Sequence, residues 1–123
     1  MTFNKLELTA IVNLAMAVAK ADGKVTNEET ATVALELAAF GVSIDDAKSI
    51  IASAINISNK DAITIISLMD IKQKKYVAAF LAVIIMADGA IEDSEVKLWS
   101  LISLLCDLPT MSIAQGVEFW KKN

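Results

Sequence analysis

The fold of this chain is decided by one stretch that occurs twice: ADGKVTNEE at residues 21–29 and ADGAIEDSE at residues 87–95. Both copies begin with Ala-Asp-Gly, continue with an aliphatic residue two positions after the Gly, and reach a Glu four positions later. Glycine ends a helix cheaply, and Thr26 with Glu29 matches a capping box that starts the next helix. The repeated stretch therefore predicts a helix–turn–helix unit that is present twice.

Apolar residues at helical spacing extend from this stretch in both directions. Segment 5–20 carries them three and four positions apart, and segment 71–86 is apolar almost all round after its first turn. We expect segment 71–86 to be the central helix of the fold. Strand-like alternation is absent. The sequence therefore predicts an all-α fold of about seven helices in a compact bundle.

Capping residues predict where the other helices start. Ser43 and Ser58 are each followed three residues later by Asp, and Asp70 is followed by Gln73, all patterns of helix N-termini. Pro109 fits the start of a last helix over 110–121, where its missing N–H costs nothing. Trp120, near the C-terminal end, is a candidate anchor exposed at an oligomer or partner surface.

The internal repeat covers most of the chain. A shift of 66 residues aligns the halves 5–56 and 71–122, and it superimposes apolar positions such as Leu14 on Phe80. We expect a single domain over residues 1–123, in which the two halves pack about a pseudo-two-fold axis. Such an axis would bring the two Asp-Gly segments to related positions.

Composition and charge exclude several classes of function. The chain has 123 residues, of which 55% are hydrophobic, and its net charge of −4 argues against nucleic-acid binding. The longest apolar run, residues 76–87, is shorter than the roughly 18–20 residues of a membrane span. There is one cysteine, Cys106, and no histidine, so a Cys–His or Ser–His nucleophile and a His-based zinc site are impossible. We expect a cytoplasmic protein that is not an enzyme.

The two acidic segments match only half of a calcium-binding EF-hand loop. The Gly, the aliphatic residue and the final Glu correspond to the second half of such a loop. The positions that should supply the first two carboxylates are Val18 and Lys20 in one copy, and Ile84 and Met86 in the other. A standard EF-hand is therefore rejected.

Two Ala-Asp-Gly-x-(Val/Ile)-x-x-x-Glu segments, each ending an apolar helix in a small acidic all-helical chain, resemble the tellurite-resistance TerB-like family. The resemblance covers nearly the whole chain. It implies a fold found in bacterial stress-response and phage-defence operons, with acidic loop residues that take part in metal binding or partner contacts. The motif carries over to Gly23 and Gly89 and to the metal-site candidates, which are Asp22, Glu29, Asp88 and Glu95.

Three interpretations of these segments remain open. In the first, the protein is a non-catalytic stress-associated module that binds a hard divalent cation (Ca²⁺, Mg²⁺ or Mn²⁺, given oxygen-only ligands) or a protein partner. In the second, the acidic residues only shape turns and cap helices, and the apolar helices form a homodimer or other scaffold. In the third, the carboxylates serve a metal-dependent hydrolase.

Overall fold

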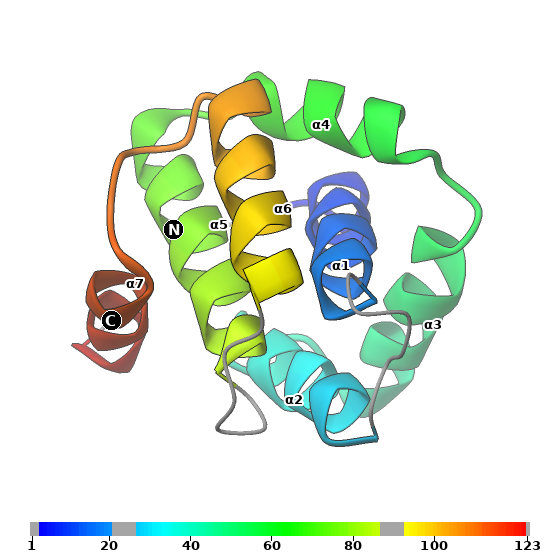
Figure 1. The fold of residues 1–123 in the computed structure, drawn as a ribbon. Helices are drawn as coiled ribbons and strands as arrows, with labels where there is room; N and C mark the ends of the chain where they lie inside the picture. Colours follow the sequence, from blue (N-terminus) through cyan, green and yellow to red (C-terminus); the bar gives the residue numbers. More distant parts are fainter. Residues whose placement is uncertain (1–2, 21–26, 87–92, 123) are drawn as a thin grey trace.

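The computed structural model describes residues 3–20, 27–86 and 93–122, and these ranges contain seven α-helices and no β-strand. The all-α fold predicted from the sequence is confirmed. The helices, shown in Figure 1, are α1 (Lys5–Ala19), α2 (Asn27–Ala38), α3 (Ile44–Ala54), α4 (Asn59–Ser67), α5 (Ile71–Ile85), α6 (Asp93–Leu105) and α7 (Ile113–Lys122). None of these helices is long and apolar enough to cross a membrane.

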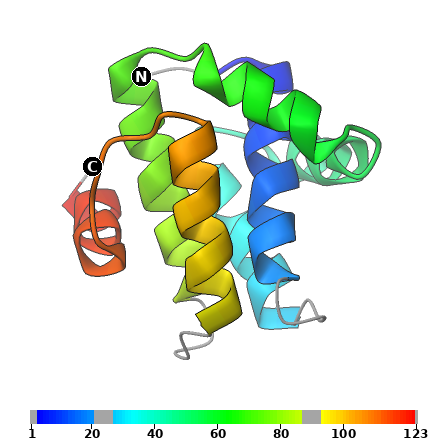
Figure 2. The same cartoon turned by 45° about the horizontal axis from the view of Figure 1, so that its top comes forward.

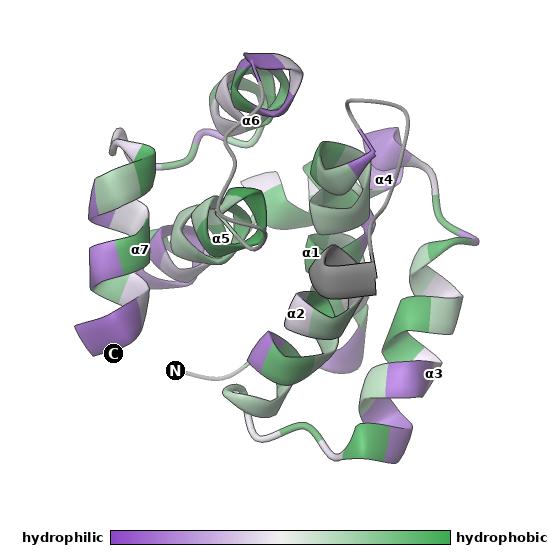
Figure 3. Cartoon of the chain, turned by 60° about the horizontal axis from the view of Figure 1, so that its bottom comes forward, coloured by the Kyte–Doolittle hydropathy of each residue, from purple (hydrophilic) through white to green (hydrophobic). Residues whose placement is uncertain are grey.

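Helices α1 and α5 form the middle of the molecule. They pack against each other, and they lie between the other helices, which surround them in Figure 3. Their fully buried side chains include Ile11 and Leu14 of α1 and Phe80 and Leu81 of α5. Segment 71–86 is therefore central, as predicted, but it shares this position with α1. Both helices are apolar nearly all round because both are covered on several sides.

The helices begin where the capping residues predicted. The hydroxyls of Ser43 and Ser58 accept hydrogen bonds from the amides of Asp46 and Asp61. Asp70 and Gln73 form a reciprocal capping box at the start of α5. Asn4 and Glu7 form a second box at the start of α1, exactly one repeat earlier in the chain. Each such cap satisfies backbone N–H groups that the first turn of a helix leaves without partners.

The prediction that Pro109 starts the last helix is wrong. Helix α7 begins at Ile113, and Pro109 lies in the connection before it. Ser112 and Gln115 determine this start: the amide of Gln115 donates to the Ser112 hydroxyl at 3.1 Å, and the amide of Ser112 donates to the Gln115 side chain at 2.8 Å. A capping box supplies two hydrogen bonds, whereas proline only tolerates the first helical position.

Trp120 is not an exposed anchor. Its ring packs edge-on against Phe40 and Phe80, with centroids 5.3 and 5.5 Å away, and its indole N–H donates to the carboxylate of Glu36. These contacts join α7 to α5 and to the end of α2. The apolar residues beside Trp120 belong to an internal aromatic cluster, which is the commoner use of aromatic side chains.

The helix boundaries follow the sequence repeat. Helices α1 and α5 begin 66 residues apart, at Lys5 and Ile71, and α2 and α6 begin 66 residues apart, at Asn27 and Asp93. Packing is reciprocal as well, since α1 contacts α6 and α5 contacts α2. Figure 2 shows α1, α5 and α6 side by side with α2 behind them. The two halves therefore interlock through their first two helices.

Candidate functional site

The structure describes one of the four predicted metal-site residues in full. Asp22 and Asp88 lie outside the described residues. Glu29 is the third residue of α2, but its side chain is also outside the description. Glu95 is the third residue of α6 and is only 3% exposed. The described helices on either side of the two acidic segments show where these segments leave and rejoin the fold.

A hydrogen bond between the two capping boxes sets the direction of α1 and α5. The Gln73 Nε2 atom donates to the Glu7 Oε2 atom at 3.3 Å, so the first turns of the two helices are in contact. Both helices have 15 residues and pack against each other, so they run the same way and end together. Their last described residues are Lys20 and Met86, which immediately precede the two acidic segments.

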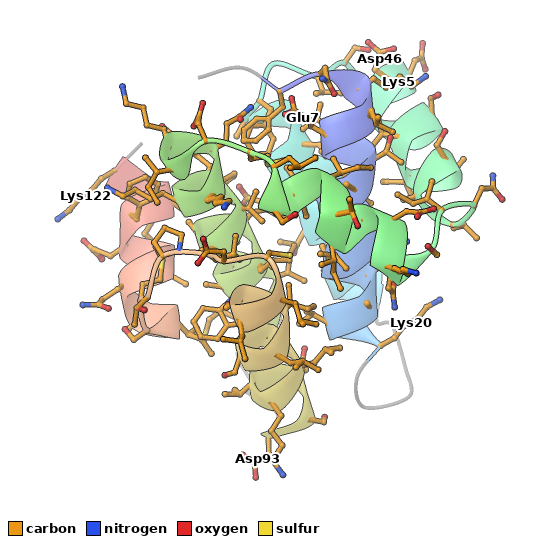
Figure 4. All side chains as sticks on the ribbon, turned by 90° about the horizontal axis from the view of Figure 1, so that it is seen from above. Lys5, Glu7, Lys20, Asp46, Asp93 and Lys122 are labelled. Atoms are coloured by element: carbon orange, nitrogen blue, oxygen red, sulfur yellow. The ribbon has the colours of Figure 1, made fainter. Side chains whose placement is uncertain are left out.

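The helices that follow the acidic segments begin at the same end of the molecule. In Figure 4, Lys20 and Asp93 both lie toward the lower side of the view, whereas Lys5 and Glu7 lie at the upper side. Figure 2 likewise shows the start of α6 and the end of α1 at its lower edge. The end of α1, before the first acidic segment, and the start of α6, after the second, thus lie at the same end of the molecule.

Glu95 is a buried carboxylate in the first turn of a helix. A carboxylate there interacts favourably with the unpaired amides and with the positive end of the helix dipole. Glu29 holds the same position in α2, one repeat earlier. Chemically, a buried carboxylate of this kind either stabilises its own helix start or binds a cation. Among the described side chains, no three from Asp, Glu, Cys or His gather as a metal site, so such a site would need side chains from residues 21–30 or 87–92.

A second group of polar residues lies where α5 begins and α6 ends. The Lys74 Nζ atom is 3.8 Å from the Asp107 Oδ2 atom, and the Lys74 side chain is buried while that of Asp107 is exposed. Burial raises the pKa of the neighbouring Cys106 thiol from 9.0 to about 11, and the Lys74 charge opposes this rise. Such a thiol is protonated at neutral pH and is a poor nucleophile.

Sequence reasoning missed this group, although the repeat contains a signal for it. Lys74 stands where the first half has the buried Leu8, and Asp107 stands where it has Gly41. Both Gly41 and Asp107 have positive φ, +80° and +55°, because each lies in the turn that ends a helix. Asp tolerates this left-handed conformation less well than Gly, so its presence there is a departure from the repeat.

A surface cavity of about 380 Å³ is the other feature that the sequence did not indicate. It lies along α6 and the connection to α7. Two of its polar atoms, Trp99 Nε1 and Ser103 Oγ, are buried and have no hydrogen-bond partner among the described residues. The remaining lining residues are Ser100, Leu104, Asp107, Leu108, Pro109, Thr110 and Met111.

The fold and these features define an all-α protein whose first two helices recur, in the same packing, as its fifth and sixth. The chain is similar to a solved crystal structure with 40% sequence identity and a TM-score of 0.89, and the match covers 98% of this chain and 92% of the other. That structure is of PG1108, a protein of unknown function from Porphyromonas gingivalis W83. The chain belongs to the same family as PG1108. No family model matches the chain, and neither does any curated protein.

Proposed function

We propose that the protein is a non-catalytic TerB-like module that binds a hard divalent cation or a protein partner through its two acidic Asp-Gly segments. One observation carries the proposal. The Gln73–Glu7 hydrogen bond joins the first turns of α1 and α5, so the two helices run the same way toward Lys20 and Met86, the described residues that precede the two acidic segments. The TerB resemblance further suggests a stress-associated role in a bacterial cytoplasm, with tellurite resistance as one form of it.

The binding group in this proposal is the set of oxygen ligands on the two segments, namely Asp22, Glu29, Asp88 and Glu95. Carboxylates gathered at one end of a protein repel one another unless a cation or a basic group offsets their charge. Oxygen ligands favour Ca²⁺, Mg²⁺ or Mn²⁺ over softer metals. Glu95 is the third residue of α6 and is buried, so its carboxylate is held at the start of the helix that follows the second acidic segment.

Calorimetric titration tests the cation. The wild-type protein is titrated separately with Ca²⁺, Mg²⁺, Mn²⁺ and Zn²⁺, and its melting temperature is measured with each. The double variant Asp22→Asn/Asp88→Asn should lose the heat of binding and the rise in melting temperature. A matched control is Asp45→Asn/Asp61→Asn, which removes two exposed carboxylates from the first turns of α3 and α4. If the wild-type protein gives no heat of binding and no change in melting temperature with any of these metals, the proposal that it binds a cation is wrong.

A second candidate function is a homo-oligomeric scaffold whose acidic segments only cap helices and shape turns. The observation that favours it is the apolar surface of α6, where Leu101 and Leu104 are 50% and 78% exposed. Light scattering on the purified protein tests it: we expect a mass that rises with concentration from the monomer toward the dimer. Asp22→Asn/Asp88→Asn should leave this association unchanged, which separates the scaffold from the cation-binding module.

A further inference from the structure

The two halves of the chain differ in how the third helix of each half packs. In the first half, α3 packs against both α1 and α2. In the second half, α7 packs extensively against α5, while its packing against α6 is at most slight. Figure 1 shows α7 beside α5, with the connection from α6 passing over to it. Helix α6 therefore lacks the cover that α3 gives to α2.

The cavity beside α6 marks the uncovered face. Its lining residues Trp99 and Ser103 occupy the repeat positions of Val33 and Leu37, which are fully buried in α2. Where the first half has a large apolar side chain, the second half has a serine next to open space. Small side chains at such positions leave room for a side chain from another helix.

The exposed side of α6 carries three leucines. Leu101 and Leu104 are 50% and 78% exposed, and Leu105 beside them is 50% exposed. Lys97, Leu101 and Leu104 are spaced by four and three residues, so they share one face of the helix. Asp107 lies two residues after the end of the helix, and its carboxylate is exposed although it is also 3.8 Å from the Lys74 Nζ atom of its own chain. The face thus has a positive charge at one end, leucines in the middle and a negative charge at the other end.

We propose that this face binds the same face of a second copy of the chain, with the two α6 helices antiparallel and the two-fold axis near Ile102. Lys97 and Asp107 lie five residues before and after Ile102, so each Lys97 meets the partner's Asp107. Leu104 then packs over the partner's Ser100, because Ser100 and Leu104 are four residues apart and share one face of the helix. The pattern is self-complementary in both charge and size, as a two-fold interface requires.

Burial favours this pairing over continued exposure of the face. The leucines leave water on association, which is the main driving force for such contacts. The interface is small, because one helix and its flanks contribute most of it. We therefore expect a reversible dimer with a dissociation constant on the order of 10–100 µM.

Sedimentation equilibrium on the full chain tests the surface, from about 5 µM to about 1 mM protein. Leu104→Asp should weaken the dimer at least about 100-fold, because each dimer carries the change twice. Leu35→Asp is the control: Leu35 is the repeat counterpart of Leu101 in α2 and is 72% exposed, close to the 78% of Leu104, and its replacement should leave the dimer unchanged. Circular dichroism confirms that both variants keep their helices.

A charge exchange tests the antiparallel orientation. Lys97→Asp places two carboxylates together at each end of its dimer, and Asp107→Lys places two ammonium groups there, so each variant alone should be monomeric. An equimolar mixture should dimerise again, because each mixed pair restores an opposite-charge contact at both ends. Raising the salt concentration should weaken the mixed dimer.

The outcomes separate this inference from the homo-oligomeric scaffold on which it rests. A protein that stays monomeric up to about 1 mM overturns both. If the wild-type dimer is insensitive to Leu104→Asp, or if Leu35→Asp disrupts it equally, the proposal that α6 forms the interface is wrong, while the homo-oligomeric scaffold is retained. A mixture of the charge variants that stays monomeric overturns the antiparallel arrangement.

Discussion

Replacing Gly116 with alanine should destabilise the protein, although alanine is the better helix former. Gly116 is buried in α7, and a Cβ atom built on it lies 2.7 Å from the Ala82 Cβ atom of α5. Carbon atoms in contact prefer about 3.5–4.0 Å, so α7 would have to move away from α5. Neither clashing atom belongs to a flexible side chain that could turn aside.

The magnitude follows from two opposing terms. Overpacking in a well-packed interior costs about 1–3 kcal/mol. Removing a glycine from a helix contributes roughly 1 kcal/mol in the other direction. We expect Gly116→Ala to lower the free energy of unfolding by about 1 kcal/mol, which in a domain of this size lowers the melting temperature by about 3–5 °C.

Urea unfolding followed by circular dichroism measures the change. The difference between Glu118→Ala and Glu118→Gly, at an exposed position of the same helix, gives the helix-propensity term separately. Adding Ala82→Gly to Gly116→Ala removes the second carbon of the clash, so the two changes should couple by at least about 1 kcal/mol. If Gly116→Ala is more stable than wild type by the propensity term alone, the close packing of α7 on α5 is wrong.

Three further predictions concern the second half of the chain. Cys106 should react with a thiol reagent at pH 8 roughly 100-fold more slowly than in urea-unfolded protein, because its raised pKa reduces the thiolate fraction. Since the pKa of the thiol is higher in the folded protein, its contribution to the free energy of unfolding should be complete below pH 9.0 and should fall between pH 9.0 and about 11. A Cys106→Ala variant should lose that fall. Lys74→Met should change the free energy of unfolding by less than about 1 kcal/mol in denaturant titration, because an apolar side chain suits this buried position, and it should raise the pKa of Cys106 further by removing a nearby positive charge. Trp120→Phe should lower the free energy of unfolding, measured in urea, by about 1–2 kcal/mol, because it leaves the Glu36 carboxylate without its indole donor. If the double variant Glu36→Ala/Trp120→Phe loses no more than Trp120→Phe alone, the hydrogen bond matters. If the losses of the two single variants add up in the double variant, the hydrogen bond contributes nothing.

The sequence was a good guide to the helices because their starts depend on local chemistry. A Ser or Asp cap and the residue three positions later form hydrogen bonds within one turn, so Ser43, Ser58 and Asp70 identified their helices directly. The same reasoning applied to Ser112 and Gln115 would have placed the start of α7 correctly. Pro109 misled because proline at a first helical position is a preference, whereas the reciprocal cap is a pair of hydrogen bonds.

Tertiary contacts were harder to predict because they join residues far apart in the chain. The Trp120 indole bonds to Glu36, 84 residues away, and periodicity alone does not show whether an aromatic residue near a chain end is covered. The acidic segments are a similar case: the sequence predicted that they occupy related positions, and the contact between the first turns of α1 and α5 agrees with this for the helices that precede them. Asp22 and Asp88 themselves lie outside the described residues.

Departures from the repeat indicate where the two halves have acquired different roles. The acidic segments keep a Glu at the same place in both halves, since Glu29 and Glu95 are each the third residue of their helix. Among the differences between the halves, three polar replacements lie around the end of α6, where Lys74 replaces Leu8, Asp107 replaces Gly41 and Ser103 replaces Leu37. A duplicated core needs only apolar residues at these places, so the polar replacements at this corner require an explanation other than folding. The proposed α6 dimer supplies one for Asp107, because it pairs this exposed carboxylate with the partner's Lys97.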